Sequence, residues 1–353
     1  MIPGTTLRMF LIVAISASLS GCYYLQAAQG QLDVLHKRVP IAELVRDGET
    51  PDELGARLQL VVEARRFSII ELGLPDNDSY LSYSDIGRDF VVWNVYAAPE
   101  FSLEPKQWCY PIVGCVSYRG YFSEDAANRV AAKLGKRGYD VAVGGVTAYS
   151  TLGKFDDPIL NTMLRWNDVQ LVAVLFHELA HQVIYIKDDT AFNESFATAV
   201  EEIGIERWLE QRGKQEEISA YRKRKELHQR LVQLAASAGE DLDVYFSETI
   251  DPDEKRLLKE QRLELLSEVV ADELQKAGRA PGHWLGGRLN NAHLIPMTLY
   301  EGRVPSFRAL LAACHEDIEC FYARSRTLSD LDKAERDARL DELAGKNVAA
   351  RSP

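Results

Sequence analysis

Near the middle of this 353-residue sequence stand two histidines four positions apart, in the stretch Phe176-His177-Glu178-Leu179-Ala180-His181. The apolar run over residues 171–176 leads into this stretch and predicts a buried helix over residues 168–186. Residues four apart on a helix project from one face, so both imidazoles can bind the same metal ion. The acid beside the first histidine, Glu178, is then placed to act as a general base toward an attacking water molecule. The stretch therefore predicts a zinc-dependent hydrolase.

A catalytic zinc site needs a third protein ligand. After the polar break Lys187-Asp188-Asp189, a second helix over about residues 190–212 is expected to pack antiparallel on the first. His181 lies about 7 Å before this break, and Glu194 lies about 6 Å back along the second helix, at 1.5 Å per residue. This matching depth makes Glu194 the predicted third ligand, whereas Glu201 lies on the same face but two turns deeper. The alternative for Glu194 is a solvated acid on a helix face.

Around this zincin-like pair of helices, the sequence predicts a mainly helical α+β fold. Runs rich in β-branched and aromatic residues at 90–96, 115–118 and 139–143 predict a small mixed sheet in the N-terminal half. Apolar residues at helical spacing over residues 214–237 and 252–277 predict a long helical hairpin in the C-terminal half.

The chain divides by pattern into three segments. We expect a lipoprotein signal peptide over residues 1–21, a helical segment with the small sheet over 22–166, and the helical zinc-site region with the hairpin over 167–353. The last two are expected to form one continuous catalytic unit over residues 23–345. A hydrophobic content of 46% with 27% charged residues is typical of a globular protein. The net charge of −12 argues against a nucleic-acid partner, because no basic surplus is present to meet phosphates.

The first residues follow the order of a secretory signal. Arg8 precedes an apolar run over residues 9–15, which is too short to span a bilayer, and small residues follow. The segment ends in Leu19-Ser20-Gly21-Cys22, which resembles the lipobox of bacterial lipoproteins. This resemblance implies cleavage before Cys22 and a lipid on its sulfur and its new amino terminus. The alternative is an ordinary signal peptide with an incidental cysteine.

A lipid on Cys22 would anchor the protein at the periplasmic face of the bacterial cell envelope. The next residue, Tyr23, is not the aspartate that usually retains lipoproteins in the inner membrane, so the outer membrane is slightly preferred. Cysteine usage agrees with export, because the other four cysteines fall into the close pairs Cys109/Cys115 and Cys314/Cys320. An even number of paired cysteines in an oxidising compartment predicts two local disulfides. Zinc binding by these cysteines is disfavoured, because the C-x-x-C spacing is absent.

A known zinc motif resembles the beginning of the second helix. The segment Phe192-Asn193-Glu194-Ser195-Phe196-Ala197 is similar to the N-E-x-F-A segment that follows H-E-x-x-H in gluzincin aminopeptidases. The resemblance implies that His177, His181 and Glu194 are zinc ligands and that Glu178 is the general base. Two departures stand out. The gap of 12 residues between His181 and Glu194 is shorter than in aminopeptidase N-like enzymes. The chain also has no G-x-M-E-N motif, whose glutamate would hold the free amino terminus of a substrate.

Nearly the whole chain after Cys22 is similar to a bacterial family of zinc aminopeptidases that are predicted lipoproteins. The resemblance rests on the Cys22-Tyr23-Tyr24 start and on residues 108–111, 118–122, 148–153, 155–158 and 290–292. It implies one zinc ion per chain, a peptide or protein substrate, and contact with a membrane through the lipid. Three functions stay open: an aminopeptidase, which we favour; a periplasmic zinc endopeptidase; and a non-catalytic envelope scaffold that binds partners through the hairpin.

Other candidate site residues are less strongly indicated. A donor to the developing oxyanion is expected, and Tyr300, Tyr149 and His293 are the candidates, although each could serve packing alone. The stretch Gly144-Gly145-Val146 begins a segment that could offer an edge to an extended peptide substrate, or could form a plain turn. Arg119 could bind a substrate carboxylate or form a structural ion pair.

Overall fold

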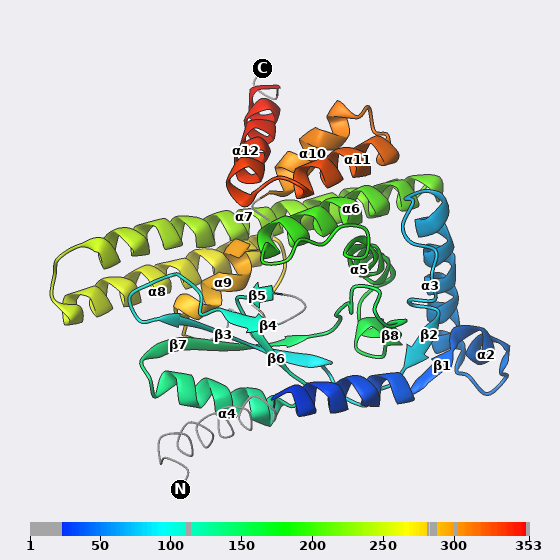
Figure 1. The fold of residues 1–353 in the computed structure, drawn as a ribbon, viewed down its shortest axis with the longest axis horizontal. Coiled ribbons are helices and arrows are strands. Elements are labelled where there is room, and N and C mark those ends of the chain that lie inside the picture. The colour runs from blue at the N-terminus through cyan, green and yellow to red at the C-terminus, as the bar shows by residue number, and fades with distance from the viewer. Residues whose placement is uncertain (1–22, 111–113, 281, 283–287, 300–302, 351–353) are drawn as a thin grey trace, which may run out of the picture.

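The computed structural model describes residues 23–110, 114–280, 282, 288–299 and 303–350. It is a mainly helical α+β fold, with small sheets in the N-terminal half and a long helix pair in the C-terminal half. The predicted fold class is therefore confirmed. In Figure 1 most helices lie above the sheets, and the first helix and α4 lie below them.

The N-terminal half starts with a helix over residues 23–36, which runs along the lower side of the molecule beside α4 (Figure 1). The helices that follow are α2 (Ile41–Arg46), α3 (Asp52–Ile70) and α4 (Glu124–Gly135). Ser123 caps α4, because its side chain accepts a hydrogen bond from the backbone N–H of Ala126.

Three small sheets make up the β-structure of the described residues. The antiparallel sheet β6-β3-β7 consists of β3 (Val92–Pro99), β6 (Arg119–Tyr121) and β7 (Tyr139–Val146). The mixed sheet β1-β2-β8 consists of β1 (Arg38–Pro40), β2 (Ser82–Ser84) and β8 (Ile159–Leu160), where β2 runs antiparallel to β1 and parallel to β8. The third is a hairpin of β4 (Trp108–Tyr110) and β5 (Gly114–Val116), in which Cys109 and Cys115 form a disulfide.

The C-terminal half is helical. Its elements are η1 (Met163–Arg165), α5 (Asp168–Ala180), α6 (Thr190–Gln211), α7 (Gln215–Ser247), α8 (Pro252–Lys276), α9 (Asn291–Leu299), α10 (Val304–Ala313), α11 (Ile318–Ser329) and α12 (Lys333–Ala350). Helices α7 and α8 pack along each other and extend to one side of the molecule (Figure 1). α7 continues past residue 237, where the prediction ended it, because Ala238 and Leu242 prolong its buried stripe against α8. A second disulfide, Cys314–Cys320, joins the end of α10 to α11, so both predicted disulfides are present.

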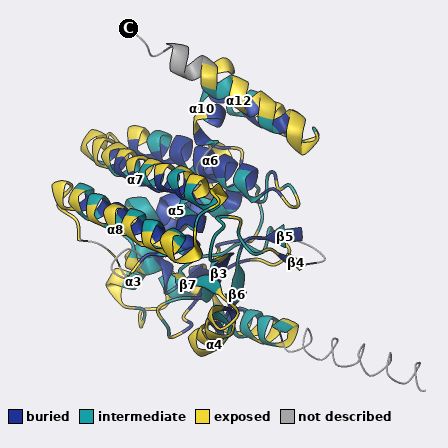
Figure 2. Ribbon diagram, turned by 90° about the vertical axis from the view of Figure 1, so that its left-hand side faces the viewer, coloured by how far each residue is buried: buried dark blue, intermediate teal, exposed yellow. Residues whose placement is uncertain are grey.

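The main hydrophobic core surrounds α5 and α6, which contain many of the buried residues in Figure 2. Gly204 of α6 makes the close approach of these helices possible, because a Cβ atom there would lie 2.6 Å from the ring of Phe176 and 2.8 Å from Leu72. α4 covers one face of the β6-β3-β7 sheet, and α9 packs against the same sheet through Ala292 and Ile295. Across the described residues, we find no helix with the length and apolar character needed to cross a membrane.

Candidate metal centre

Helix α5 positions the two histidines. It begins at Asp168 and is capped by Asn167, whose side chain accepts a hydrogen bond from the backbone N–H of Gln170 at 2.9 Å. It ends at Ala180, with His181 as its C-cap, so the prediction that it continues to residue 186 is wrong. The backbone N–H of His181 still donates to the carbonyl of His177 at 3.4 Å, which keeps both side chains on one helix face.

The helix ends early because α6 fixes the connection between the two helices. The Asn193 side chain accepts a hydrogen bond from the backbone N–H of Ile186 and donates one to its carbonyl, both at 2.7 Å. Asp189 caps α6 by accepting from the backbone N–H of Phe192 at 3.1 Å, and its other oxygen binds Arg336 of α12 at 2.7 Å. These contacts place Glu194, in the first turns of α6, opposite the histidines.

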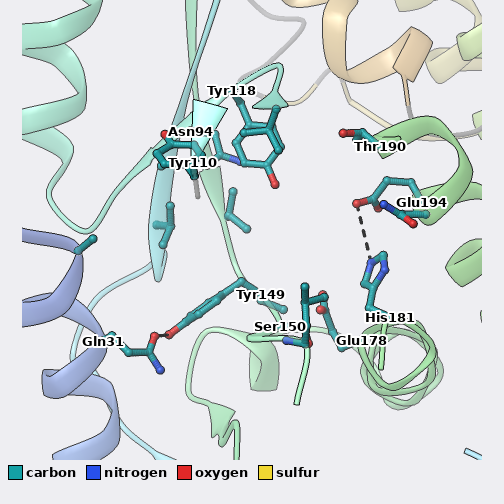
Figure 3. A pocket seen from close by; sticks show the side chains of 18 of the residues that line it. Gln31, Asn94, Tyr110, Tyr118, Tyr149, Ser150, Glu178, His181, Thr190 and Glu194 are labelled. Carbon is teal, nitrogen blue, oxygen red and sulfur yellow. Dashed lines mark hydrogen bonds and ion pairs between the residues drawn. The ribbon is translucent and has the colours of Figure 1, made fainter. Parts of the chain in front are cut away.

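Three potential ligands, His177, His181 and Glu194, converge where α5 and α6 face each other, and Figure 3 shows the last two. Nε2 of His177 lies 3.3 Å from Oε2 of Glu194, and Nε2 of His181 lies 3.8 Å from Oε1 of the same carboxylate. One ligand atom from each residue lies within 4.8 Å of the others, so the group could hold a metal ion. The depth argument therefore identified a third residue that the fold does bring to the histidine pair.

The donor set fits zinc. Two imidazole nitrogens and one carboxylate form a three-ligand set of the catalytic type, which leaves a position for substrate or water. The side chains are largely buried, with exposed fractions of 17% for His177, 9% for His181 and 21% for Glu194. Nδ1 of His181 is buried and makes no hydrogen bond within the described part of the chain.

A fourth residue, Glu201, contacts the ring of His177 on the side away from Glu194. Nδ1 of His177 lies 3.3 Å from Oε2 of Glu201, two turns further along α6. Glu201 also accepts a hydrogen bond from the hydroxyl of Tyr221 at 3.0 Å and lies 3.6 Å from Nζ of Lys225. Burial alone would raise the pKa of Glu201, but Lys225 and His177 outweigh it and lower the pKa to about 2. A carboxylate in this place fixes the tautomer and the orientation of a ligand histidine.

The two histidines of the cluster differ in protonation. Burial lowers the pKa of His181 to about 4, which leaves this imidazole neutral at pH 7. Burial alone would also lower the pKa of His177, but its hydrogen bonds to Glu194 and Glu201 outweigh burial and raise it to about 10. A metal ion and a proton therefore compete for His177.

The predicted base, Glu178, faces the cavity beside this cluster (Figure 3). Burial raises its pKa to about 7, which is the range of an effective general base near neutral pH. Asp157 lies close enough to Glu178 for its charge to raise the pKa of Glu178 further. One oxygen of Asp157 accepts hydrogen bonds from the backbone N–H and the hydroxyl of Thr151 at 2.7 and 2.9 Å. These contacts order the loop that carries Ser150, which lines the cavity near Glu178.

A cavity of about 790 Å³ opens in front of the cluster. Its walls come from α5 and α6, from the strands β3, β4, β5, β6 and β7, from the loop over residues 147–152, and from the helix over residues 23–36. Eight of the lining residues are aromatic: Tyr23, Tyr24, Tyr96, Tyr110, Tyr118, Phe122, Tyr149 and Tyr185. The arrangement can therefore enclose a substrate beside a metal and a base.

Tyr118 is a residue of the cavity wall that sequence reasoning missed as a candidate oxyanion donor. It lies in the turn between β5 and β6, and its hydroxyl points across the cavity toward Glu194 (Figure 3). Burial, with Glu194 and Tyr96 nearby, raises the pKa of Tyr118 far above its ordinary value, so the hydroxyl keeps its proton. Tyr118 stands in one of the stretches that carried the family resemblance, and this was the available signal.

The remaining candidate site residues from the sequence are Tyr149, His293, Arg119, Cys22 and Tyr300. The hydroxyl of Tyr149 donates to Oε1 of Gln31, away from the metal cluster. His293 is hydrogen-bonded to Asn290 in the region where α9 begins, and it does not line the cavity. Arg119 stacks on the ring of Tyr23, with 3.9 Å between its guanidinium carbon and the ring centroid. Cys22 and Tyr300 lie outside the described residues.

The candidate peptide edge is only partly at the cavity. Gly144, Gly145 and Val146 pair with residues 92–94 of β3, and β7 forms one edge of its sheet. Val146 lines the cavity, whereas Gly144 and Gly145 do not. Gly145 lies directly against the ring of Phe90, since a Cβ atom there would come within 2.4 Å of it.

The site and the fold together define an α+β protein with a two-histidine, one-carboxylate centre inside an aromatic cavity. A family model described as "Putative aminopeptidase" matches residues 22–340, and the chain belongs to this family. No curated protein and no solved structure matches the chain. Membership in this family implies a peptide substrate for the enzyme.

Proposed function

We propose that this protein is a zinc metallopeptidase of the gluzincin type that removes residues from the amino terminus of peptides. The observation that carries the proposal is the convergence of His177, His181 and Glu194 at the wall of the cavity that also contains Glu178. Two histidines and a glutamate are a known catalytic zinc set. The family match over residues 22–340 supports the same reaction class.

Each residue has a distinct role in this proposal. His177, His181 and Glu194 hold the zinc ion, and Glu201 orients the ring of His177. Bound zinc supplies an acidified water molecule and polarises the scissile carbonyl. Glu178 accepts the proton of the attacking water on its carboxylate and delivers it to the leaving amine. The hydroxyl of Tyr118 donates a hydrogen bond to the oxyanion as it develops.

The decisive experiment combines metal analysis with hydrolysis. We expect about one zinc ion per purified chain, and we expect His177→Ala, His181→Ala and Glu194→Ala each to lose it. Glu178→Gln should retain the zinc and lose hydrolysis, because the amide cannot accept the proton. Folded protein that binds no metal, or a fully active Glu178→Gln variant, would refute the proposal.

The mode of cleavage is tested with a matched pair of substrates. Amino-acid 4-nitroanilides should be hydrolysed, and the same compounds with an acetylated amino group should resist hydrolysis. Equal cleavage of both forms would instead identify an endopeptidase with the same metal centre and the same base.

We also propose that Cys22 carries a lipid that anchors the enzyme to the bacterial cell envelope, with the outer membrane preferred. The Leu19-Ser20-Gly21-Cys22 sequence supports this proposal. The helix over residues 23–36 follows directly and exposes Leu25 and Leu32, with exposed fractions of 60% and 50%. Mass spectrometry of the mature amino terminus and membrane fractionation test the anchor. Cys22→Ala should release the protein into the soluble periplasmic fraction.

A further inference from the structure

The helix over residues 23–36 is built into the wall of the cavity. It contributes Tyr23, Tyr24, Ala27 and Gln31 to the lining. This wall lies across the cavity from the metal cluster. In Figure 3, Gln31 of the wall and Glu194 of the cluster lie on opposite sides of the cavity. The helix is therefore more than a tether to an anchor.

Close contacts fix this helix in place. A Cβ atom at Gly30 would lie 2.1 Å from the ring of Phe122, so the ring rests directly on the helix backbone. The backbone N–H of Phe122 donates to Oε1 of Gln26 at 3.3 Å. Further along the helix, the hydroxyl of Ser84 donates to the carbonyl of Val34 at 3.0 Å. The wall is accordingly part of the folded core structure.

The charges of the cavity lie at one end. Among the described lining residues, the carboxylates are those of Glu178 and Glu194, and both belong to the proposed metal site. The residues that line the far wall have no charged side chains, but a cation outside the lining lies over each of two of their rings, Arg119 over Tyr23 and Arg88 over Phe122. A cationic substrate side chain would lose its hydration there and meet like charge instead of a counter-ion.

We propose that this cavity, called the substrate chamber below, selects substrates in which a residue next to the cleaved bond has a large, uncharged, apolar or aromatic side chain. The inference rests on the proposed peptidase function and names its substrate class. The side chain packs against the aromatic wall, while the peptide bond faces the metal cluster and Glu178. Gln31 lies on this wall, and its Nε2 atom is buried without a hydrogen-bond partner in the described structure. Gln31 is thus the position at which a single change of charge should redirect the preference.

Binding to the full-length Glu178→Gln protein tests the chamber without turnover. Calorimetric titration uses X-Ala-Ala and N-acetyl-Ala-X-Ala-Ala peptides, in which X is Phe, Leu, Lys or Glu. In at least one of the two series, we expect the Phe and Leu peptides to bind at least tenfold more tightly than the Lys and Glu peptides. Equal affinities, tighter binding of Lys, or no binding of any peptide would overturn the inference.

The sharper test introduces a charge on the wall. Adding Gln31→Glu to this background should strengthen binding of the Lys peptide at least tenfold and weaken binding of the Phe peptide. Gln29→Glu places the same charge on the exposed face of the same helix and should leave both affinities unchanged. Gln31→Met keeps the wall uncharged and should preserve the order of Phe over Lys. If Gln31→Glu and Gln29→Glu give the same affinities, the chamber wall does not determine which substrate side chain is bound.

Hydrolysis by the wild-type protein separates the two proposals. If zinc-loaded protein binds the Phe peptide selectively but cleaves no peptide, the proposed peptidase function fails and the selective chamber stands. If it cleaves Phe and Lys peptides with equal kcat/KM, the peptidase stands and the inference about the substrate fails.

Discussion

Nδ1 of His177 and Oε2 of Glu201 lie 3.3 Å apart, on the opposite side of the imidazole from the contact between Nε2 and Glu194. One ring is thus held by two carboxylates of the same helix. Glu201→Gln weakens the acceptor and should lower zinc affinity 10- to 100-fold. Competition with a chromophoric chelator measures the change. Glu206→Gln, whose carboxylate binds Arg222 and Arg308 away from the site, is the matched control. Equal affinities for the two variants would exclude an orienting role for Glu201.

Tyr118→Phe removes the proposed oxyanion donor and keeps the ring. We expect kcat to fall by about 10²–10³, the cost of one lost donor at such a site, while zinc content stays at the wild-type level. Steady-state kinetics and metal analysis provide both readouts. Tyr245→Phe on α7 removes a hydroxyl from a side chain outside the cavity and should retain wild-type kcat. An unchanged kcat in Tyr118→Phe would assign the donor role to another group.

Asp157 gives a pH-dependent prediction for stability. Burial raises its pKa to about 6, above the value near 4 that an unfolded carboxyl has. Its protonated form is therefore favoured in the folded protein, and the stability it contributes is lost as the pH rises from about 4 through about 6. Asp157→Asn removes the buried charge, so its unfolding free energy relative to wild type should rise over this pH range, by at most about 3 kcal/mol. Urea unfolding at pH 4.5, 6 and 7.5 measures the difference. A difference that stays constant with pH would contradict the assignment.

Gly204 permits the close contact of α5 with α6. Gly204→Ala would place a methyl group against Phe176 and Leu72, and we expect a loss of about 1–3 kcal/mol of unfolding free energy from overpacking. Gly135→Ala, at the end of α4 where a Cβ atom meets open space, serves as the control and should be neutral or slightly stabilising. Thermal unfolding of both variants decides the matter. Equal melting temperatures would mean that the helices adjust at no cost.

The metal centre was predictable because its determinants are local in sequence. Two histidines on one helix and Glu194 at matching depth on the next need only helix geometry and a short connection. The early end of α5 was not predictable, because it depends on the Asn193 side chain reaching back to Ile186. Residues 181–186 continue the apolar pattern and have no helix-breaking residue, so their sequence alone favours a longer helix.

The cavity wall was hidden for a different reason. The contacts that bring the helix over residues 23–36 to the site join residues 96 and 118 positions apart, Gln26 with Phe122 and Gln31 with Tyr149. No periodic pattern encodes such distant contacts. Tyr118 was missed likewise, because a single tyrosine in a turn has no pattern that marks the direction of its hydroxyl.

The contacts of this first helix bear on the order in which the site assembles. The histidines and Glu194 belong to neighbouring helices, so closing the loop between them costs little chain entropy and can occur early in folding. The helix over residues 23–36 is made before the strands that it contacts, yet it can pack only after residues 118–149 have formed their strands. We therefore expect zinc binding to precede formation of the substrate chamber during refolding. The chain would acquire its metal first and its selectivity last.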